Sequence, residues 1–94
     1  MAHEVAVRVR IEGRVQMVGF RYWALDRAAV LGLDGWVRNR GDGSVEAVFA
    51  GAAEAVAEMV RGCRRGPPMA TVERVIEQAE EGDVRPGFHL MPTA

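Results

Sequence analysis

The chain has 94 residues, a length that accommodates one domain with an adequate but not generous core. Its formal net charge of -1 produces no strong field that would favour nucleic acid or a membrane surface as partner. The single cysteine, Cys63, excludes an intrachain disulfide and a cysteine-type metal cluster, which is typical of a reducing compartment. No signal-peptide pattern is present, and no apolar run approaches the ~18–20 residues of a membrane span. We therefore expect one cytoplasmic domain over residues 1–94, monomeric, with no membrane or nucleic-acid partner.

Hydrophobic periodicity predicts the secondary structure. Strands are indicated by a period of two in β-branched residues, and helices by apolar residues at i, i+3, i+4 and i+7. In chain order we expect strand 5–11 ending at Gly13, helix 21–31 ending near Gly32, strands 33–40 and 44–50, helix 51–63, strand 71–79 and a short edge strand 88–91. The turn between the second and third strands is rich in Gly and Asp, so these two strands form a β-hairpin.

This order, βαββαβ, predicts an α+β ferredoxin-like sandwich with two helices packed on one face of a mainly antiparallel sheet. The neighbouring residues Val75 and Ile76 interrupt the alternation of the last long strand, which predicts either a bulge or a strand with two apolar faces. In this topology the first and third strands are central neighbours, and the second lies beside the third. The loop after the first strand and the turn after the second are then expected to approach each other at one end of the sheet.

The segment from Gly13 to Arg21 connects the first strand to the first helix and is the main candidate for a binding site. Unpaired N–H groups, the helix dipole and the guanidinium of Arg21 all favour an anion at this point. Gly19 lacks a side chain and permits a ligand to approach the backbone closely. The same residues also suit a tight turn followed by a solvated arginine, and the local pattern leaves both interpretations open.

Asn39, at the end of the second strand, is the second candidate. Asparagine is a common turn residue, and in this topology it also lies where its amide can face the same pocket as Arg21. Weaker candidates are His3 and His89, which have no partner at metal-ligand spacing, and Cys63, which we interpret as a small core residue. The first strand has no aromatic residue on its polar face, which argues against an RNA-binding platform.

Two motifs connect the chain to a known family. The first is residues 11–21, IEGRVQMVGFR, and the second is GWVRN at 35–39, followed by Gly43, Val45 and Gly51. With these motifs the chain closely resembles the acylphosphatases over nearly its whole length. The resemblance implies the ferredoxin-like fold, hydrolysis of an acyl phosphate to a carboxylate and inorganic phosphate, and no metal or organic cofactor.

The resemblance also implies roles for individual residues. By similarity, Arg21 is the catalytic arginine that binds the phosphoryl group, and Asn39 is the asparagine that orients the attacking water. The backbone amides that form the phosphate cradle correspond to Val15, Gln16, Met17, Val18, Gly19 and Phe20. An acyl phosphate already has a good leaving group, so positioning and charge stabilisation suffice without a strong general base. The water proton is then expected to pass to the substrate's own phosphate, with little change in kcat between about pH 5 and 8.

The chain departs from the family at Met17, where acylphosphatases usually have glycine. If this position requires a positive φ, a non-glycine residue adds about 1–2 kcal/mol of strain. The thioether is expected either to crowd the cradle or to point into solvent. The leading hypothesis is a small acylphosphatase; the alternatives are an anion-binding module with weak or no activity because of Met17, and a nucleic-acid or protein-interaction domain of the same fold.

Overall fold

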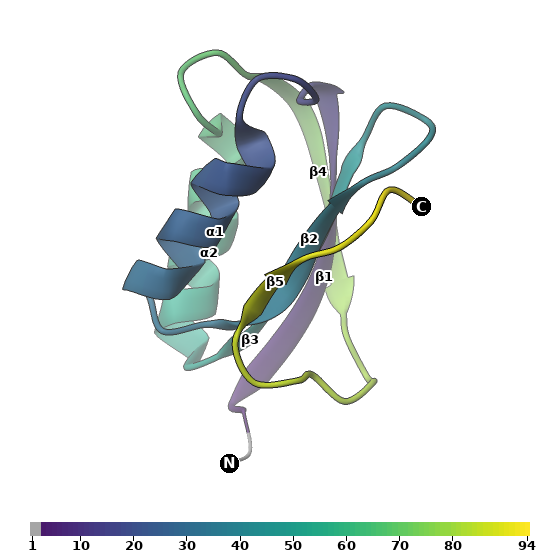
Figure 1. Ribbon diagram of the computed structural model, residues 1–94. Coiled ribbons are helices and arrows are strands. Elements are labelled where there is room, and N and C mark those ends of the chain that lie inside the picture. The colour runs from purple at the N-terminus through teal and green to yellow at the C-terminus, as the bar shows by residue number, and fades with distance from the viewer. Residues whose placement is uncertain (1–2) are drawn as a thin grey trace.

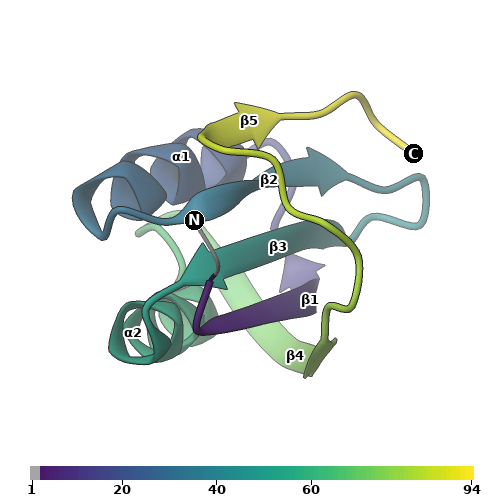
Figure 2. The ribbon, with the colours of Figure 1, turned by 90° about the horizontal axis from the view of Figure 1, so that it is seen from below.

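Two helices cover one face of a single five-stranded sheet in the computed structural model, which describes residues 3–94 (Figure 1). The elements are β1 (Val5–Arg14), α1 (Phe20–Val30), β2 (Asp34–Asn39), β3 (Val45–Gly51), α2 (Ala53–Arg65), β4 (Thr71–Ala79) and β5 (Phe88–Leu90). The strand order is β4-β1-β3-β2-β5, in which β5 runs parallel to β2 and the other neighbours are antiparallel (Figure 2). The predicted ferredoxin-like sandwich is confirmed, with β5 as an added edge strand. Neither helix in the described part of the chain is long and apolar enough to cross a membrane.

The core lies between the sheet and the two helices. Alternate residues of the central strands point into it, together with one face of each helix. Its buried members include Val9, Ile11, Phe20, Ala24, Ala28, Val37, Val45, Ala47, Phe49, Val56, Met59, Val60 and Cys63. Burying a side chain the size of valine or phenylalanine contributes roughly 1.5–3 kcal/mol, so this layer provides the main stabilisation of the fold.

The strand β1 is longer than its alternation predicts. It continues through Gly13 to Arg14, so the expectation that Gly13 ends the strand is wrong. Gly13 pairs with Val72 of β4, and a Cβ at Gly13 would lie 2.2 Å from the carbonyl oxygen of Thr71. Glycine is therefore required here for the close approach of two backbones rather than for a turn. The extra residues carry the chain to the end of the sheet, where the candidate loop begins.

The strand β4 contains the predicted irregularity. Glu12 pairs with Arg74 while Gly13 pairs with Val72, which leaves one extra residue in β4 and defines a β-bulge. The bulge allows Val72 and Val75 to pack against the core together, although their spacing would otherwise place them on opposite faces. Ile76 lies on the opposite face beside arginines of β1, so the strand has apolar residues on both sides.

The helix α1 begins at Phe20, one residue earlier than predicted, and Gly32 follows its last turn with a φ of 68°. Phe20 packs into the core, whereas Trp23 lies on the flank of the helix that faces α2. Successive residues of an α-helix are about 100° apart, so Arg21 lies on the other flank. That flank faces β2 and β5, because α1 packs against both of these strands.

Candidate active site

The loop between β1 and α1 is anchored by three apolar side chains. Val15, Val18 and Phe20 are buried in the core, whereas Met17 and Gly19 are exposed. Because the apolar side chains point inward, the loop backbone is held at the protein surface with its peptide groups accessible. Packing against the core therefore positions the loop without covering its backbone.

The backbone N–H groups of residues 16–22 have no hydrogen-bond acceptor on the protein within the described range 3–94. The first helical bond of α1 runs from the Trp23 N–H to the Gly19 carbonyl, at 3.0 Å. Gly19 is the N-cap, with φ 82°; among the described residues no side chain caps the helix, and its first turn carries no acidic residue. Free N–H groups and the positive end of the helix dipole thus converge, an arrangement that suits an anion.

Gln16 ties this loop to the β2–β3 hairpin. Its side-chain Nε2 donates to the carbonyl oxygens of Arg40 at 2.8 Å and Ser44 at 2.9 Å. Arg40 directly follows Asn39, so the side chain of Gln16 draws the loop and the end of β2 to the same end of the molecule (Figure 1). The sequence suggested Gln16 only as the source of a backbone amide. A single glutamine in a loop carries no local signal for such a bridge, since its partners lie 24 and 28 residues away.

The side chains of Arg21 and Asn39 both lie on the helix-covered side of the sheet. Val37 of β2 is fully buried beneath the helices, and Asn39, two residues later, projects to the same side. Among residues 3–94, neither the Arg21 guanidinium nor the Asn39 amide hydrogen bonds to another protein group. The carbonyl of Asn39 accepts from the Ala94 N–H at 3.1 Å, so the strand end is held while its side chain stays unengaged.

Met17 lies in the same loop with a φ of 63°, the left-handed conformation that favours glycine. No other non-glycine residue in the described range 3–94 has a positive φ. Its side chain is 100% exposed. The condition for backbone strain is therefore met, whereas the thioether points into solvent and does not pack against the loop.

The remaining candidates have structural surroundings. Burial raises the pKa of the Cys63 thiol to about 12, as expected for a core residue. The Nε2 of His3 lies 2.7 Å from a carboxylate oxygen of Asp34, and this hydrogen bond, with that from the Gly87 N–H, lowers the pKa of Asp34. Within residues 3–94 no group of three potential metal-ligating side chains comes together.

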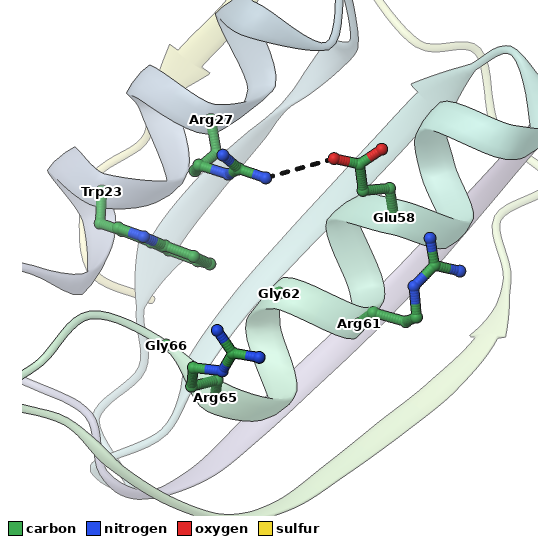
Figure 3. Close-up of a pocket in the computed structure, with 7 residues that line it drawn as sticks. All are labelled: Trp23, Arg27, Glu58, Arg61, Gly62, Arg65 and Gly66. Carbon is green, nitrogen blue, oxygen red and sulfur yellow. Dashed lines mark hydrogen bonds and ion pairs between the residues drawn. The ribbon is translucent and has the colours of Figure 1, made fainter.

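A hollow of about 380 Å³ lies between the two helices (Figure 3). It is lined by Trp23, Arg27, Glu58, Arg61, Gly62, Arg65 and Gly66. Arg27 reaches across it to Glu58, with 3.4 Å between nitrogen and oxygen. This hollow lies on the α2-facing flank of α1 and is therefore separated by the helix from Arg21.

The fold and the loop define a class of small ferredoxin-like domains with an accessible strand-to-helix loop. Residues 7–90 match the family model of acylphosphatase. An acylphosphatase of Nitrobacter winogradskyi is 53% identical over 97 aligned positions, which cover 97% of this chain and 98% of the relative. The structure of an acylphosphatase from Coxiella burnetii matches with a TM-score of 0.89 at 30% identity, covering 95% of this chain and 94% of that one. The acylphosphatase of Bacillus subtilis matches with a TM-score of 0.87 at 32% identity, covering 93% and 98%.

The chain belongs to the acylphosphatase family. It is a hydrolase whose substrate is a small-molecule acyl phosphate, so the leading hypothesis from the sequence is confirmed at the level of family and activity.

Proposed function

We propose that this acylphosphatase holds the phosphate of its substrate in the loop amides of residues 15–20 and the guanidinium of Arg21, while Asn39 orients the attacking water. One observation carries the proposal: the side chain of Gln16 joins the loop to the hairpin, so that free N–H groups and the unengaged side chains of Arg21 and Asn39 belong to one end of the fold. We also propose that phosphate itself, or a similar anion, binds in this loop.

The chemistry follows from the charges. Water attacks phosphorus, the bond between phosphorus and the acyl oxygen breaks, and a carboxylate and inorganic phosphate are released. Negative charge on the phosphoryl oxygens is stabilised by Arg21 and the amides, and one such preorganised donor contributes about 2.7–4 kcal/mol. The water donates a hydrogen bond to the carboxamide oxygen of Asn39 and passes a proton to a phosphate oxygen of the substrate. This route needs no histidine or carboxylate in the site.

The anion-binding module with weak or no activity is not supported as an alternative. Its premise was that Met17 obstructs the loop, but this side chain is wholly exposed. Named acylphosphatases also match the chain over nearly its full length. We further propose that residues 1–94 act as one domain, as a monomer in the cytoplasm, in keeping with the family match over residues 7–90 and the single buried cysteine.

Turnover of acetyl phosphate tests the assigned roles. We expect Arg21→Ala to lower kcat/KM by at least about 10²-fold and to abolish inhibition by inorganic phosphate, because it removes a donor to the phosphoryl group. Asn39→Ala is expected to lower kcat while phosphate inhibition stays close to wild type, since this amide acts on water. Arg85→Ala, a change of an exposed arginine in the loop before β5, is the matched control and should behave as wild type. Wild-type turnover in either site variant would refute the corresponding role.

A further inference from the structure

Glu46 is a buried carboxylate on the face of the sheet opposite the helices. It lies on β3, and the residue is only 6% exposed. Its neighbours Val45 and Ala47 point into the core, so the Glu46 side chain projects to the other side. Charged residues are rarely buried to this degree unless they are paired, and an unpaired carboxylate here would be strongly destabilising.

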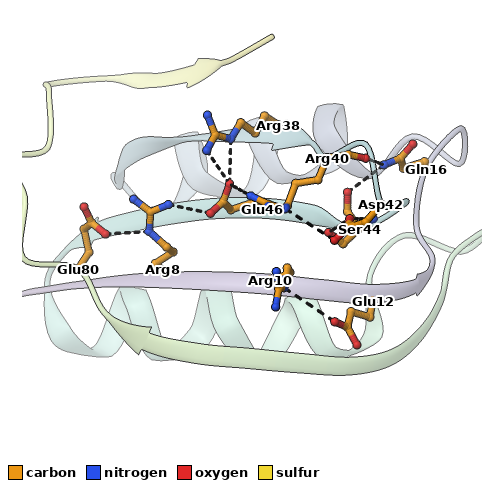
Figure 4. A network of polar contacts seen from close by, with 10 residues as sticks. All are labelled: Arg8, Arg10, Glu12, Gln16, Arg38, Arg40, Asp42, Ser44, Glu46 and Glu80. Atoms are coloured by element: carbon orange, nitrogen blue, oxygen red, sulfur yellow. Dashed lines mark hydrogen bonds and ion pairs between the residues drawn. The ribbon is translucent and has the colours of Figure 1, made fainter. Parts of the chain in front are cut away.

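Three arginines surround this carboxylate (Figure 4). Arg8 of β1 donates from Nη1 at 2.7 Å, Arg38 of β2 from Nε at 2.8 Å, and Arg40 from Nη1 at 3.1 Å. Burial by itself raises the pKa of Glu46, but the hydrogen bonds from Arg8 and Arg38 and the charges of the surrounding guanidinium groups outweigh it, so the pKa is lowered. Glu46 is therefore an ionised acceptor at neutral pH and holds all three side chains together.

Two of these arginines are the chain neighbours of Asn39. Arg38 and Arg40 project to the face that carries Glu46, whereas Asn39 projects to the face that carries the helices. Because Glu46 holds the side chains of Arg38 and Arg40 on the opposite face of the sheet, the backbone at residue 39 has less freedom to rotate. The carbonyl of Arg40 in addition accepts the hydrogen bond from Gln16, so the same residue is held by Glu46 on one side and by the phosphate loop on the other.

The arrangement is reinforced by Trp36. The guanidinium carbon of Arg38 lies 4.7 Å from the Trp36 ring centroid, and that of Arg8 lies 5.3 Å from it. Cation–π contacts of this kind are attractive and restrict the rotamers of both arginines. The carboxylate of Glu46 thus meets guanidinium groups that are already oriented.

We propose that Glu46 is a positioning residue for Asn39. From the opposite face of the sheet, Glu46 fixes the end of β2 through Arg38 and Arg40, and this orients the Asn39 amide toward the attacking water. This inference rests on the proposed role of Asn39. Glu46 touches neither substrate nor water, and it acts only through the strand that it braces. Small misplacements of an orienting group reduce rates substantially, so loss of the contacts that hold the end of β2 has a measurable effect on kcat.

The test compares Glu46→Gln with Glu80→Gln, using acetyl phosphate as substrate and inorganic phosphate as inhibitor. The change at Glu46 replaces one carboxylate oxygen with an NH2 group that cannot accept from a guanidinium. We expect kcat to fall about tenfold, while the inhibition constant of phosphate changes less than about twofold. Within residues 3–94 the Glu80 side chain pairs with Arg8 alone, at 3.0 Å, on the same face, so its variant loses the same charge without releasing β2 and should keep the wild-type kcat. An unchanged kcat in Glu46→Gln would overturn the inference.

A double-mutant cycle separates this role from a general structural one. If Glu46 acts through Asn39, adding Glu46→Gln to Asn39→Ala lowers kcat by less than about twofold beyond the single variant. If Glu46→Gln lowers kcat by the same factor in the wild-type and the Asn39→Ala backgrounds, the inference is overturned. If Asn39→Ala alone retains full activity, then the proposed function of Asn39 fails, which is a separate result.

Arg40→Lys provides a second variant that does not depend on the stability of Glu46→Gln. Lysine retains the charge but not the planar fork, so it can approach Glu46 without reproducing the same geometry. We expect a smaller fall in kcat, about threefold, again absent in the Asn39→Ala background. An equal fall in kcat in the Asn39→Ala background would contradict the positioning role of Glu46.

Discussion

Replacing Met17 with glycine separates backbone strain from side-chain contacts in the proposed phosphate-binding loop. Met17 has a φ of 63° and a fully exposed side chain, so the substitution removes strain and no packing. Relief of the left-handed conformation is worth about 1–2 kcal/mol. The greater flexibility of glycine in the unfolded chain offsets about 0.4–1 kcal/mol of this. The expected net gain is about 0.5–1 kcal/mol, which corresponds to a rise in Tm of about 2–8 °C for a domain of this size.

The assay is thermal unfolding followed by circular dichroism, combined with turnover of acetyl phosphate. Met17→Ala is the matched control, because it removes the thioether but keeps a Cβ at the same φ; its Tm should stay close to wild type. We expect kcat/KM of Met17→Gly to stay within about threefold of wild type, since the side chain points away from the protein. A lower Tm in the glycine variant, or equal stabilisation by alanine, would refute the strain argument. A tenfold rise in kcat/KM would show that Met17 impairs substrate binding or turnover in the loop.

Further predictions concern residues that stabilise the loop, the sheet and the core. Gln16→Met should weaken inhibition by phosphate and lower the free energy of unfolding by about 1–3 kcal/mol, because it removes the 2.8 and 2.9 Å hydrogen bonds to the hairpin; unchanged values in both measurements would contradict the bridge. Gly35→Ala should destabilise the protein by more than about 2 kcal/mol in urea unfolding, because its Cβ would lie 1.8 Å from the Val48 carbonyl oxygen and its φ is 137°. The arginines around Glu46 lower its folded-state pKa below that in the unfolded chain, so its stabilisation is full above the unfolded pKa and is lost as pH falls through the folded pKa; the urea midpoint should therefore fall less steeply in acid for Glu46→Gln than for wild type. Cys63, with a pKa raised to about 12 by burial, should react with a thiol reagent only after unfolding, and rapid labelling of the native protein would contradict its core position.

Much of the fold was predictable because its signals are local. The period of two in residues 5–11 and the apolar face of α2 follow directly from which side chains must leave water. The hairpin follows from turn chemistry, and β4 was predicted with its observed bounds, Thr71–Ala79. The loop to Arg21 was a candidate because small residues between a strand and a helix N-terminus produce a pattern within one short stretch of chain, and its role as a binding site stays a prediction.

The errors and omissions share one physical cause, which is contact between residues far apart in the chain. Gly13 resembled a strand end, but the backbone of β4 lies against it and extends the ladder to Arg14. The sequence predicted a role only for the backbone amide of Gln16, because folding alone brings the hairpin carbonyls within reach of its side chain.

The proposed phosphate-binding loop shows most clearly which features depend on local sequence and which on tertiary structure. Local chemistry predicts its N–H groups, its glycine and its arginine, since these depend on residues adjacent in the chain. Whether Met17 blocks the cradle or points into solvent, and whether Asn39 is held rigid by Glu46, depends on how the strands and helices pack. Periodicity encodes which face of an element is buried, whereas the partner that meets each polar side chain is decided by the relative placement of elements that no local pattern records.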